Sequence, residues 1–408
     1  MASKSVSVPH RLRWPLGYTA VAVLVFLAYY YVIPNLGPDA QTFFRNWLPL
    51  TSVNEALVWV ICALGLNIVV GYAGLLDLGF VAFWAIGGYV AGWLMSGKFY
   101  DVNFNFLGGA SGPGIHISFW LVLIVGGAFC ALWGVIIGAP TLRLKSDYLA
   151  LVTLGFGEII PQVFLNGDNI GGFNLTNGAQ GITPVDPIAI GSTKLGPFDL
   201  VWKYLIFVGI AALVVFITLR LREGRLGRAW LAIREDELAA SMMGVPLMRT
   251  KLAAYAVGAV AGGLGGVAFA THVNGVLPDR FNFSISITLL AMVVLGGMGN
   301  VWGVILGALV LAWINSTGLP QFGTSFNDQF GTNVNFPSYN FLLFGGILVL
   351  MMLFRREGIL PESRTRLILK EPSRTDMESL HADMEEAAPE LDEDLEPVIA
   401  ADGTGEKA

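Results

Sequence analysis

Long apolar runs recur along the chain as far as residue 354 and constrain its fold more than any other feature. A helix crosses a bilayer core about 30 Å thick with about 20 apolar residues. Charged residues make up only 13% of the 408 residues, about half the share usual in soluble domains. We therefore predict an all-α polytopic integral membrane protein with about ten transmembrane helices. The candidate spans are residues 16–33, 50–70, 80–96, 118–139, 148–165, 199–219, 252–271, 285–298, 301–316 and 339–354.

Two of these assignments leave a choice open. The eighth and ninth spans are short and are separated only by Gly299 and Asn300, so they form either two half-helices or a tight hairpin. The first span is longer than the apolar segment of a signal peptide, and no small-x-small cleavage site follows it. We expect it to be a retained helix.

Lysine and arginine in short loops indicate the orientation of a membrane protein, because they stay on the cytoplasmic side. Ten spans and a cytoplasmic N-terminus place four groups of basic residues on the same side and leave few positive charges in the opposite loops, so both termini are predicted to be cytoplasmic. This organisation comprises an N-terminal segment (1–15), a transmembrane domain (16–356) and a charged cytoplasmic loop (220–251). Outside that loop, the residues of the other three basic groups are Lys4, Arg11, Arg13, Arg143, Lys145, Arg355 and Arg356.

The last segment, residues 371–408, differs in composition from the rest. It holds 13 acidic and 2 basic residues, a net charge of −11 in a chain whose total is −6. Acidic segments with few aromatic residues do not bury enough apolar surface to fold. We predict a disordered cytoplasmic tail, either simply solvated or used for docking. The body of the chain then carries +5, and nothing in this charge pattern indicates a nucleic-acid partner.

The motifs of common enzymes are absent from the sequence. It has no phosphate-binding G-x-x-x-x-G-K-[ST] loop, no H-E-x-x-H and no G-x-S-x-G. Cys62 and Cys130 lie within apolar runs, and we interpret them as small core residues. We predict no catalytic residue, no metal site and no cofactor bound by this chain. The four histidines are too scattered for an obvious metal cluster: His10, His116, His272 and His381.

Glycines spaced four residues apart lie on one face of a helix, and such faces let helix backbones approach closely. They serve packing alone or form a surface that shears during transport. The candidate helix-packing residues are Gly258, Gly262, Gly266, Gly299, Gly303 and Gly307, and a further pair is Gly134 and Gly138.

A few polar residues lie at membrane depth, where ionisable groups are costly and commonly functional. Glu158 follows two glycines and precedes Pro161, a pattern that predicts a weakened helix. Glu158 either lines the translocation path of a transporter, or has a structural role near the outer membrane interface or in stabilising a bend. Asp77 lies in a glycine-rich segment whose pattern predicts a bent or re-entrant backbone. This segment either lines the translocation path or only closes a cytoplasmic hairpin. The candidate path residues are Asn67, Asp77, Tyr148, Thr153 and Glu158.

The loop at residues 220–251 contains one predicted amphipathic helix, residues 229–243, ended by Gly244 and Pro246. Its apolar residues at helical spacing indicate contact with lipid headgroups or with a protein groove. Membrane-surface helices favour basic residues on the polar face, whereas this helix has an acidic middle, which favours the protein groove. The apolar residues are Trp230, Ile233, Leu238 and Met242.

Four blocks of sequence, in this order, resemble the LivM-type permease subunits of branched-chain amino acid ABC importers. The likeness covers about residues 50–354. The blocks are GYAGLLDLGFVAFWAIGGYVAG at 71–92, LRLKSDYLALVTLGFGEIIP at 142–161, GRAWLAIREDELAASMMG at 227–244 and LGGMGNVWGVILG at 295–307.

The resemblance implies an ABC importer permease architecture in the plasma (inner) membrane of a prokaryote. It implies transport of leucine, isoleucine and valine with a LivH-type permease partner and an extracytoplasmic substrate-binding protein. Two ABC ATPase subunits would bind ATP and Mg²⁺ and hydrolyse the ATP. The loop resembles the coupling loop whose helix docks on an ATPase. Its candidate residues are Arg234, Glu235, Asp236, Glu237, Ala239, Ala240 and Gly244.

Two alternative functions stay open at this point. A urea or short-amide ABC permease would share the architecture and differ in substrate. A proton-coupled secondary transporter would use Glu158 as its proton site and need no ATPase.

Overall fold

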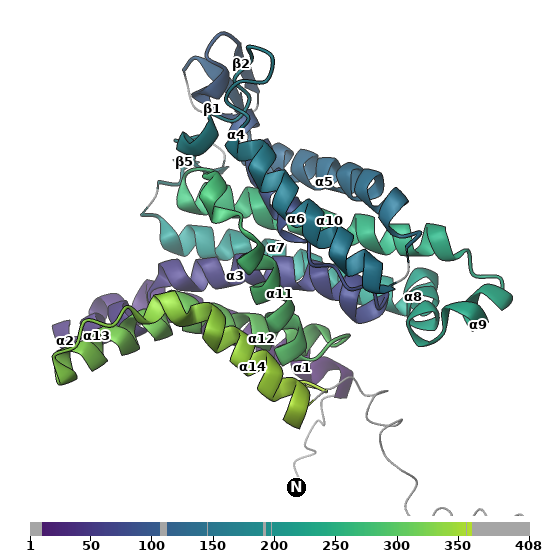
Figure 1. Ribbon diagram of the computed structural model, residues 1–408. Coiled ribbons are helices and arrows are strands. Elements are labelled where there is room, and N and C mark those ends of the chain that lie inside the picture. Colours follow the sequence, from purple (N-terminus) through teal and green to yellow (C-terminus); the bar gives the residue numbers. More distant parts are fainter. Residues whose placement is uncertain are drawn as a thin grey trace, which may run out of the picture. The chain divides into compact units, whose positions relative to one another are not determined.

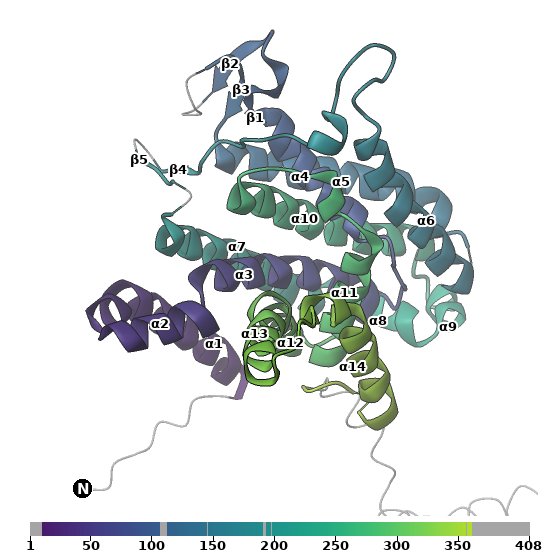
Figure 2. The ribbon, with the colours of Figure 1, turned by 60° about the vertical axis from the view of Figure 1, so that its left-hand side comes forward.

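The long helices run between a β-containing cap at one end and two short helices, α8 and α9, at the other (Figures 1 and 2). The computed structural model describes residues 10–106, 112–144, 146–190, 193–196, 198–355 and 357–360. The predicted tail (371–408), residues 1–9, Lys145 and Arg356 lie outside the described residues.

The predicted spans coincide with observed helices. Among the described residues, nine helical stretches are long and apolar enough to cross a membrane, and Val81–Leu94 is a shorter apolar helix. The short eighth and ninth spans form a tight hairpin, because α11 and α12 pack against each other. The helices in or beside the spans are α1 His10–Leu27, α3 Leu50–Leu66, η3 Asn67–Tyr72, α4 Val81–Leu94, α5 Phe119–Thr141, α6 Ser146–Leu165, α7 Leu200–Glu223, α10 Leu247–Val273, α11 Phe283–Gly296, α12 Val301–Trp313, η7 Ile314–Gly318 and α14 Asn340–Phe354.

The structure also contains two helices that the span prediction missed, α2 (Pro38–Trp47) and α13 (Leu319–Phe330). Each has a proline in its first turn, where the missing N–H costs nothing. Both helices carry polar residues among their aromatic ones, so their sequences do not predict a transmembrane span. The remaining short helices are η1 Ala28–Val32, η2 Ile33–Asn35, η4 Gly97–Phe99, η5 Gly178–Gln180, η6 Pro278–Arg280 and η8 Phe336–Tyr339.

Helix α10 forms the centre of the core and packs against α5, α4 and α3. The three glycines of the predicted set lie on its packed faces: a Cβ on Gly258 would meet Val69 of η3, one on Gly262 would meet Phe83 of α4, and one on Gly266 would meet the backbone of α4. The predicted packing role of this set agrees with these contacts. Gly303 and Gly307 of α12 lie against α11 in the same way.

Gly299 does not belong to a helix face, contrary to the predicted set of Gly299, Gly303 and Gly307. It precedes α12, in the turn of the α11–α12 hairpin, with φ of +85°. Glycine adopts this left-handed conformation without steric cost. The spacing of four was therefore misleading here, because a turn interrupts the helix between Gly296 and Val301.

The cap consists of a three-stranded sheet in the order β1-β3-β2 and the connection that follows α6. β1 (Met95–Ser96) is antiparallel to β3 (Gly114–Ile117), with Met95 opposite His116, and β2 (Asn103–Phe106) is parallel to β3. A separate hairpin pairs β4 (Ala189–Ile190) with β5 (Thr193–Lys194).

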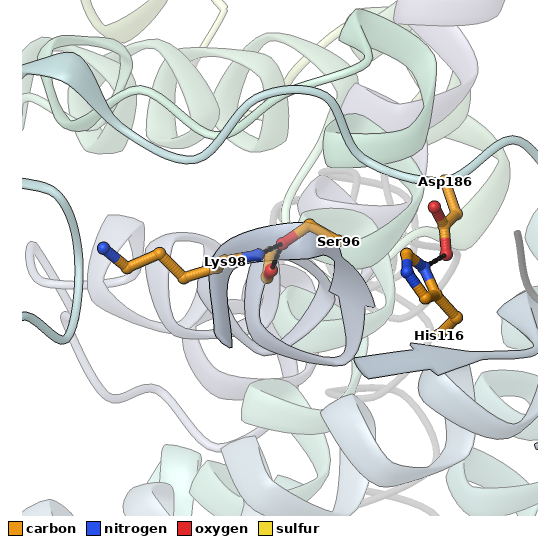
Figure 3. Close-up of polar contacts among 5 residues, drawn as sticks. Ser96, Lys98, His116 and Asp186 are labelled. Atoms are coloured by element: carbon orange, nitrogen blue, oxygen red, sulfur yellow. Dashed lines mark hydrogen bonds and ion pairs between the residues drawn. The ribbon is translucent and has the colours of Figure 1, made fainter. Parts of the chain in front are cut away.

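The cap is tied together by a buried contact between a histidine and an aspartate. His116 Nδ1 on β3 lies 2.7 Å from Asp186 Oδ2 in the connection after α6, and the two side chains point toward each other (Figure 3). The backbone N–H of Asp186 donates to Met95 O at 2.6 Å, and Ile182 pairs with Val276 beyond the end of α10. The connection is thereby fixed to the ends of both α4 and α10.

Candidate functional site

The connection between η3 and α4 enters the helix bundle. The Leu78 N–H donates to Thr153 Oγ1 on α6 at 3.1 Å, and Gly79 lies against the α6 backbone at Thr153 and Gly157. Thr153 is seven residues beyond the start of α6, about 10 Å along its axis at 1.5 Å per residue. The predicted re-entrant segment thus lies beside the middle of a membrane helix, a place where irregular backbone occurs only when protein or a cavity surrounds it.

Asp77 is fully buried in this connection, at 1% exposure. Its Oδ1 accepts a hydrogen bond from the Gly79 N–H at 2.8 Å, and its carboxyl group interacts with the Tyr255 hydroxyl on α10. At the end of the connection, the Val81 N–H donates to Ser286 Oγ on α11 at 3.1 Å. The segment is therefore held by α6, α10 and α11, and the structure brings Asp77 and Thr153 to one place.

Asn67 occupies a different place, at the start of η3. Its Oδ1 accepts from the Gly299 N–H at 2.9 Å, which ties η3 to the α11–α12 hairpin. The side chain is buried, and its Nδ2 has no hydrogen-bond partner among the described residues. Asn67 therefore joins two helical units at the end of the bundle that carries α8 and α9.

Tyr148 and Glu158 lie on the outer face of α6, away from Thr153. Tyr148 is 63% exposed, and Glu158 is exposed too, between apolar neighbours such as Leu151 and Ile159. Helix α6 continues through Pro161 to Leu165, so the helix that the sequence predicted to be weakened here is not broken. A proline interrupts one backbone bond without ending a helix whose neighbours hold it.

Residues 225–242 form two helices where the sequence predicted one: α8 (Arg225–Glu235) and α9 (Glu237–Met242). Asp236 separates them with extended backbone, φ −155° and ψ 114°, and its side chain accepts from the N–H groups of Leu238 and Ala239. The cause is therefore an N-cap: an aspartate that satisfies the first free N–H groups of α9. We call α8 and α9 together the arm.

Three side chains brace the arm against the bundle. Trp230 is fully buried and donates from Nε1 to Thr250 O on α10 at 2.8 Å. Arg234 donates to the Gly71 carbonyl at the end of η3, and its aliphatic stem covers Gly74. Glu237 pairs with Lys251 of α10. Arg234 therefore contacts the very start of the re-entrant connection that carries Asp77.

Three apolar side chains at α9 and its C-cap are exposed. Leu238, Met242 and Met243 are 67%, 80% and 85% exposed. Trp230 and Ile233, which the sequence placed on the same helix face as Leu238 and Met242, are instead buried within the chain. The other residues predicted for the coupling loop are likewise partly buried and partly exposed. Ala240 is buried, and Glu235, Ala239 and Gly244 are exposed.

Comparison with known proteins identifies the family. The family model for the permease component of branched-chain amino acid transport systems matches residues 48–352, most of the transmembrane domain. The chain belongs to this family. It is a multi-pass membrane protein and a transport component rather than an enzyme, as the resemblance implied.

Three relatives illustrate the range of similarity. The chain is 36% identical over 388 residues to the high-affinity branched-chain amino acid transport system permease protein LivM of Escherichia coli K12, covering 90% of this chain and 82% of that protein. It is 37% identical over 335 residues to LivM of Salmonella typhimurium, covering 77% and 70%. The permease protein LivH of E. coli K12 is 28% identical over 154 residues, covering 38% and 44%. No solved structure gives a significant match.

Within the described part of the chain, no three histidine, cysteine, aspartate or glutamate side chains are grouped so that they could hold a metal ion. The polar partners of the connection, Ser286 and Tyr255, were not predicted from the sequence. A serine and a tyrosine within apolar runs carry no signal until the fold places them beside Asp77.

Proposed function

We propose that this chain is a permease subunit of an ATP-driven importer that carries leucine, isoleucine and valine across the plasma membrane. The names of the relatives support the substrate class, since both LivM proteins belong to high-affinity branched-chain amino acid transport systems. The two arrangements described above, the arm and the re-entrant connection, supply the parts that coupling to a separate ATPase requires.

The observation that carries the proposal is the arm. Leu238 and Met242 lie one turn apart on α9, Met243 follows at its C-cap, and all three apolar side chains are exposed. Amphipathic helices of this kind fit apolar grooves on partner proteins. The occupant we propose is an ABC ATPase subunit, one of two that bind and hydrolyse ATP with Mg²⁺. Methionine suits such a contact because its flexible side chain adapts to irregular surfaces.

The bracing contacts supply the route by which a movement of the ATPase would reach the path. A displaced arm pulls on α10 through Trp230 and through the Glu237–Lys251 pair. It pulls on the start of the re-entrant connection through Arg234. Because Asp77 and Thr153 lie in and beside that connection, the movement reaches the middle of the bundle directly.

The outer face of α6 supports a second permease subunit. Glu158 lies twelve residues beyond the start of α6, about 18 Å along its axis, and its carboxylate is exposed. A charge facing lipid at this depth is costly, so we propose that a LivH-type permease covers this face. The similarity between this chain and LivH fits two related subunits that enclose the path. The cap would then face the substrate-binding protein outside the membrane.

The first test is uptake of labelled leucine and labelled urea by cells that lack this chain and by cells in which it is restored. We expect leucine uptake to be lost and rescued, with urea uptake unchanged. Loss and rescue of urea uptake alone would keep the architecture and replace the substrate. If neither uptake changes, the proposed substrate class is wrong.

A second test addresses the arm. Met242→Lys places a charge in the proposed contact, and Met242→Leu keeps it apolar as a matched control. We expect the lysine variant to lose co-purification with the ATPase subunits and leucine uptake, while the leucine variant keeps both. Equal co-purification of the two variants would contradict a docking role for the arm.

A further inference from the structure

A cavity of about 200 Å³ lies toward the cap end of the bundle, among α3, α4, α10, η6, α11, η7 and α14. Binding sites for drug-sized molecules measure about 300–1,000 Å³, so this volume suits a smaller ligand. Its walls combine opposite charges with aromatic rings. The residues that the argument uses are Glu55, Trp59, Trp84, Phe269, Arg280 and Asn340.

The charged groups lie on two elements that meet at the cavity. Glu55 on α3 is half-buried and accepts from Trp59 Nε1 at 3.4 Å. Arg280 on η6 is close enough to interact electrostatically with Glu55. The third charged residue of the lining is Asp279, which is exposed beside Arg280. The cavity thus offers a carboxylate and a guanidinium to one small ligand.

Two further polar groups at the cavity lack partners. Trp84 is 1% exposed, yet its Nε1 has no acceptor among the described residues. Asn340 donates from Nδ2 to Asn315 Oδ1 at 3.3 Å, while its own Oδ1 has no donor. Buried polar groups in native proteins nearly always have a hydrogen-bond partner. The indole N–H of Trp84, a residue of the cavity lining, therefore needs an acceptor that the described residues do not supply.

The rest of the wall is aromatic. The rings of Trp59 and Trp84 meet edge to face with centroids 4.7 Å apart, and those of Trp84 and Phe269 with centroids 5.0 Å apart. Binding of an aliphatic group against such a wall is favourable, because it removes apolar surface from water. Polar groups at one side and rings at the other are the arrangement that fixes the orientation of a small amphipathic ligand.

We propose that this cavity is a transient binding site for one free α-amino acid with an apolar side chain. Glu55 would accept from the α-ammonium group, and Arg280 with the Trp84 N–H would bind the α-carboxylate. The aliphatic side chain would lie against Trp59 and Phe269. The inference rests on the proposed function and adds to it a place on the path and the chemical groups that recognise the substrate.

The position of Trp84 connects this site to the coupling machinery. Trp84 lies on α4 one turn beyond Val81, where the re-entrant connection ends and the backbone is held by Ser286 of α11. Ser284, Ile285 and Thr288 of the same α11 segment line the cavity. A shift of the connection would therefore change the cavity wall and release the ligand.

The test compares leucine uptake in deletion cells that carry the full chain with Trp84→Phe, Glu55→Gln or the control Trp202→Phe. The control is the same substitution on α7 at a tryptophan that is 48% exposed. Phenylalanine keeps the ring and removes only the N–H, and glutamine keeps the shape of glutamate. We expect uptake to fall about tenfold to a hundredfold in both cavity variants, the effect of losing a hydrogen bond to a charged group, and to be unchanged in the control.

A second measurement reports occupancy without depending on transport rates. The complex is purified with its partner subunits and irradiated with photo-leucine, which carries a diazirine in its side chain. We expect labelled peptides from α3 and α10, which carry Trp59 and Phe269. Leucine should compete with this labelling, whereas 3-methylbutylamine and 4-methylpentanoate, each of which lacks one charged group, should not. Competition by either analogue as strong as that by leucine would overturn the recognition we propose.

The outcomes separate the two proposals. If the unmodified chain restores leucine uptake, while both cavity variants match the control and no label reaches α3 or α10, the cavity proposal is wrong and the importer stands. If the unmodified chain restores no leucine uptake, the importer proposal fails and the cavity proposal fails with it.

Discussion

Substituting Gly266 by alanine tests whether α4 and α10 really pack backbone to backbone. A Cβ at this position would lie 2.6 Å from the backbone nitrogen of Gly88 and closer still to the carbonyl oxygen of Trp84. Ordinary van der Waals contact begins at 3.4 Å, so the nitrogen alone is 0.8 Å too close. Both neighbours are backbone atoms of α4. The clash is therefore relieved only if the whole helix moves.

Overpacking of a rigid core costs about 1–3 kcal/mol. A large chain loses about 2 °C of melting temperature per kcal/mol, so we expect Gly266→Ala to melt about 2–6 °C lower. The assay heats detergent-solubilised protein and measures the fraction that stays monodisperse. Trp84 lies on the displaced helix, whereas its ring partners Trp59 and Phe269 lie on α3 and α10, so leucine uptake is expected to fall as well.

Gly209→Ala is the matched control. Gly209 lies within α7, and a Cβ there would meet nothing within 4 Å. Alanine raises intrinsic helix preference by about 1 kcal/mol at either position, so the difference between the two variants isolates the steric term. Melting of Gly266→Ala at or above the temperature of Gly209→Ala would refute the close packing of α4 on α10.

Three further predictions concern single contacts. Asn67→Ala leaves the buried Gly299 N–H without its acceptor and should cost about 1–3 kcal/mol, measured by the same melting assay; an unchanged melting temperature would contradict the contact. Asp236→Ala removes the N-cap of α9, worth about 0.5–2 kcal/mol, and should lower leucine-stimulated ATP hydrolysis, whereas Asp236→Ser keeps a cap and should restore it; equal rates would exclude the cap. Arg234→Ala removes the brace to Gly71 and should reduce uptake while the complex still assembles; retained uptake would show that the brace transmits nothing.

The helices of the membrane domain were predictable because each depends on a local property. Runs of apolar residues identify a membrane helix regardless of its neighbours, and the ten predicted spans match observed helices. The glycine spacing of α10 identified its packed faces for the same reason. The order of four sequence blocks pointed to the family that the comparisons then confirmed.

The sequence analysis missed features in which a single residue changes the backbone conformation that the surrounding pattern predicts. Asp236 divides the predicted helix because its side chain competes for backbone N–H groups. Gly299 has helical spacing from Gly303 and lies in a turn. Pro161, interpreted as a sign of a weakened helix, lies inside an α6 that continues to Leu165 as the predicted span did. Periodicity alone does not distinguish these cases.

The cavity was not predictable from the sequence at all. Its lining residues come from positions as distant as Glu55 and Asn340, and each has an ordinary interpretation in its own segment. From the sequence alone, Arg280 is interpreted as a charged residue in a loop and Trp84 as an aromatic residue of the core. Only the fold shows that a guanidinium, a carboxylate and an indole without an acceptor surround one space.

The measurement that tests the central claim most directly is leucine transport by the purified complex in proteoliposomes. The complex contains this chain, its permease partner and both ATPase subunits, with the substrate-binding protein supplied on the opposite side. We predict that labelled leucine accumulates when ATP is present on the ATPase side, and that a proton gradient without ATP drives no accumulation. Accumulation driven by the proton gradient alone would contradict an ATP-driven permease.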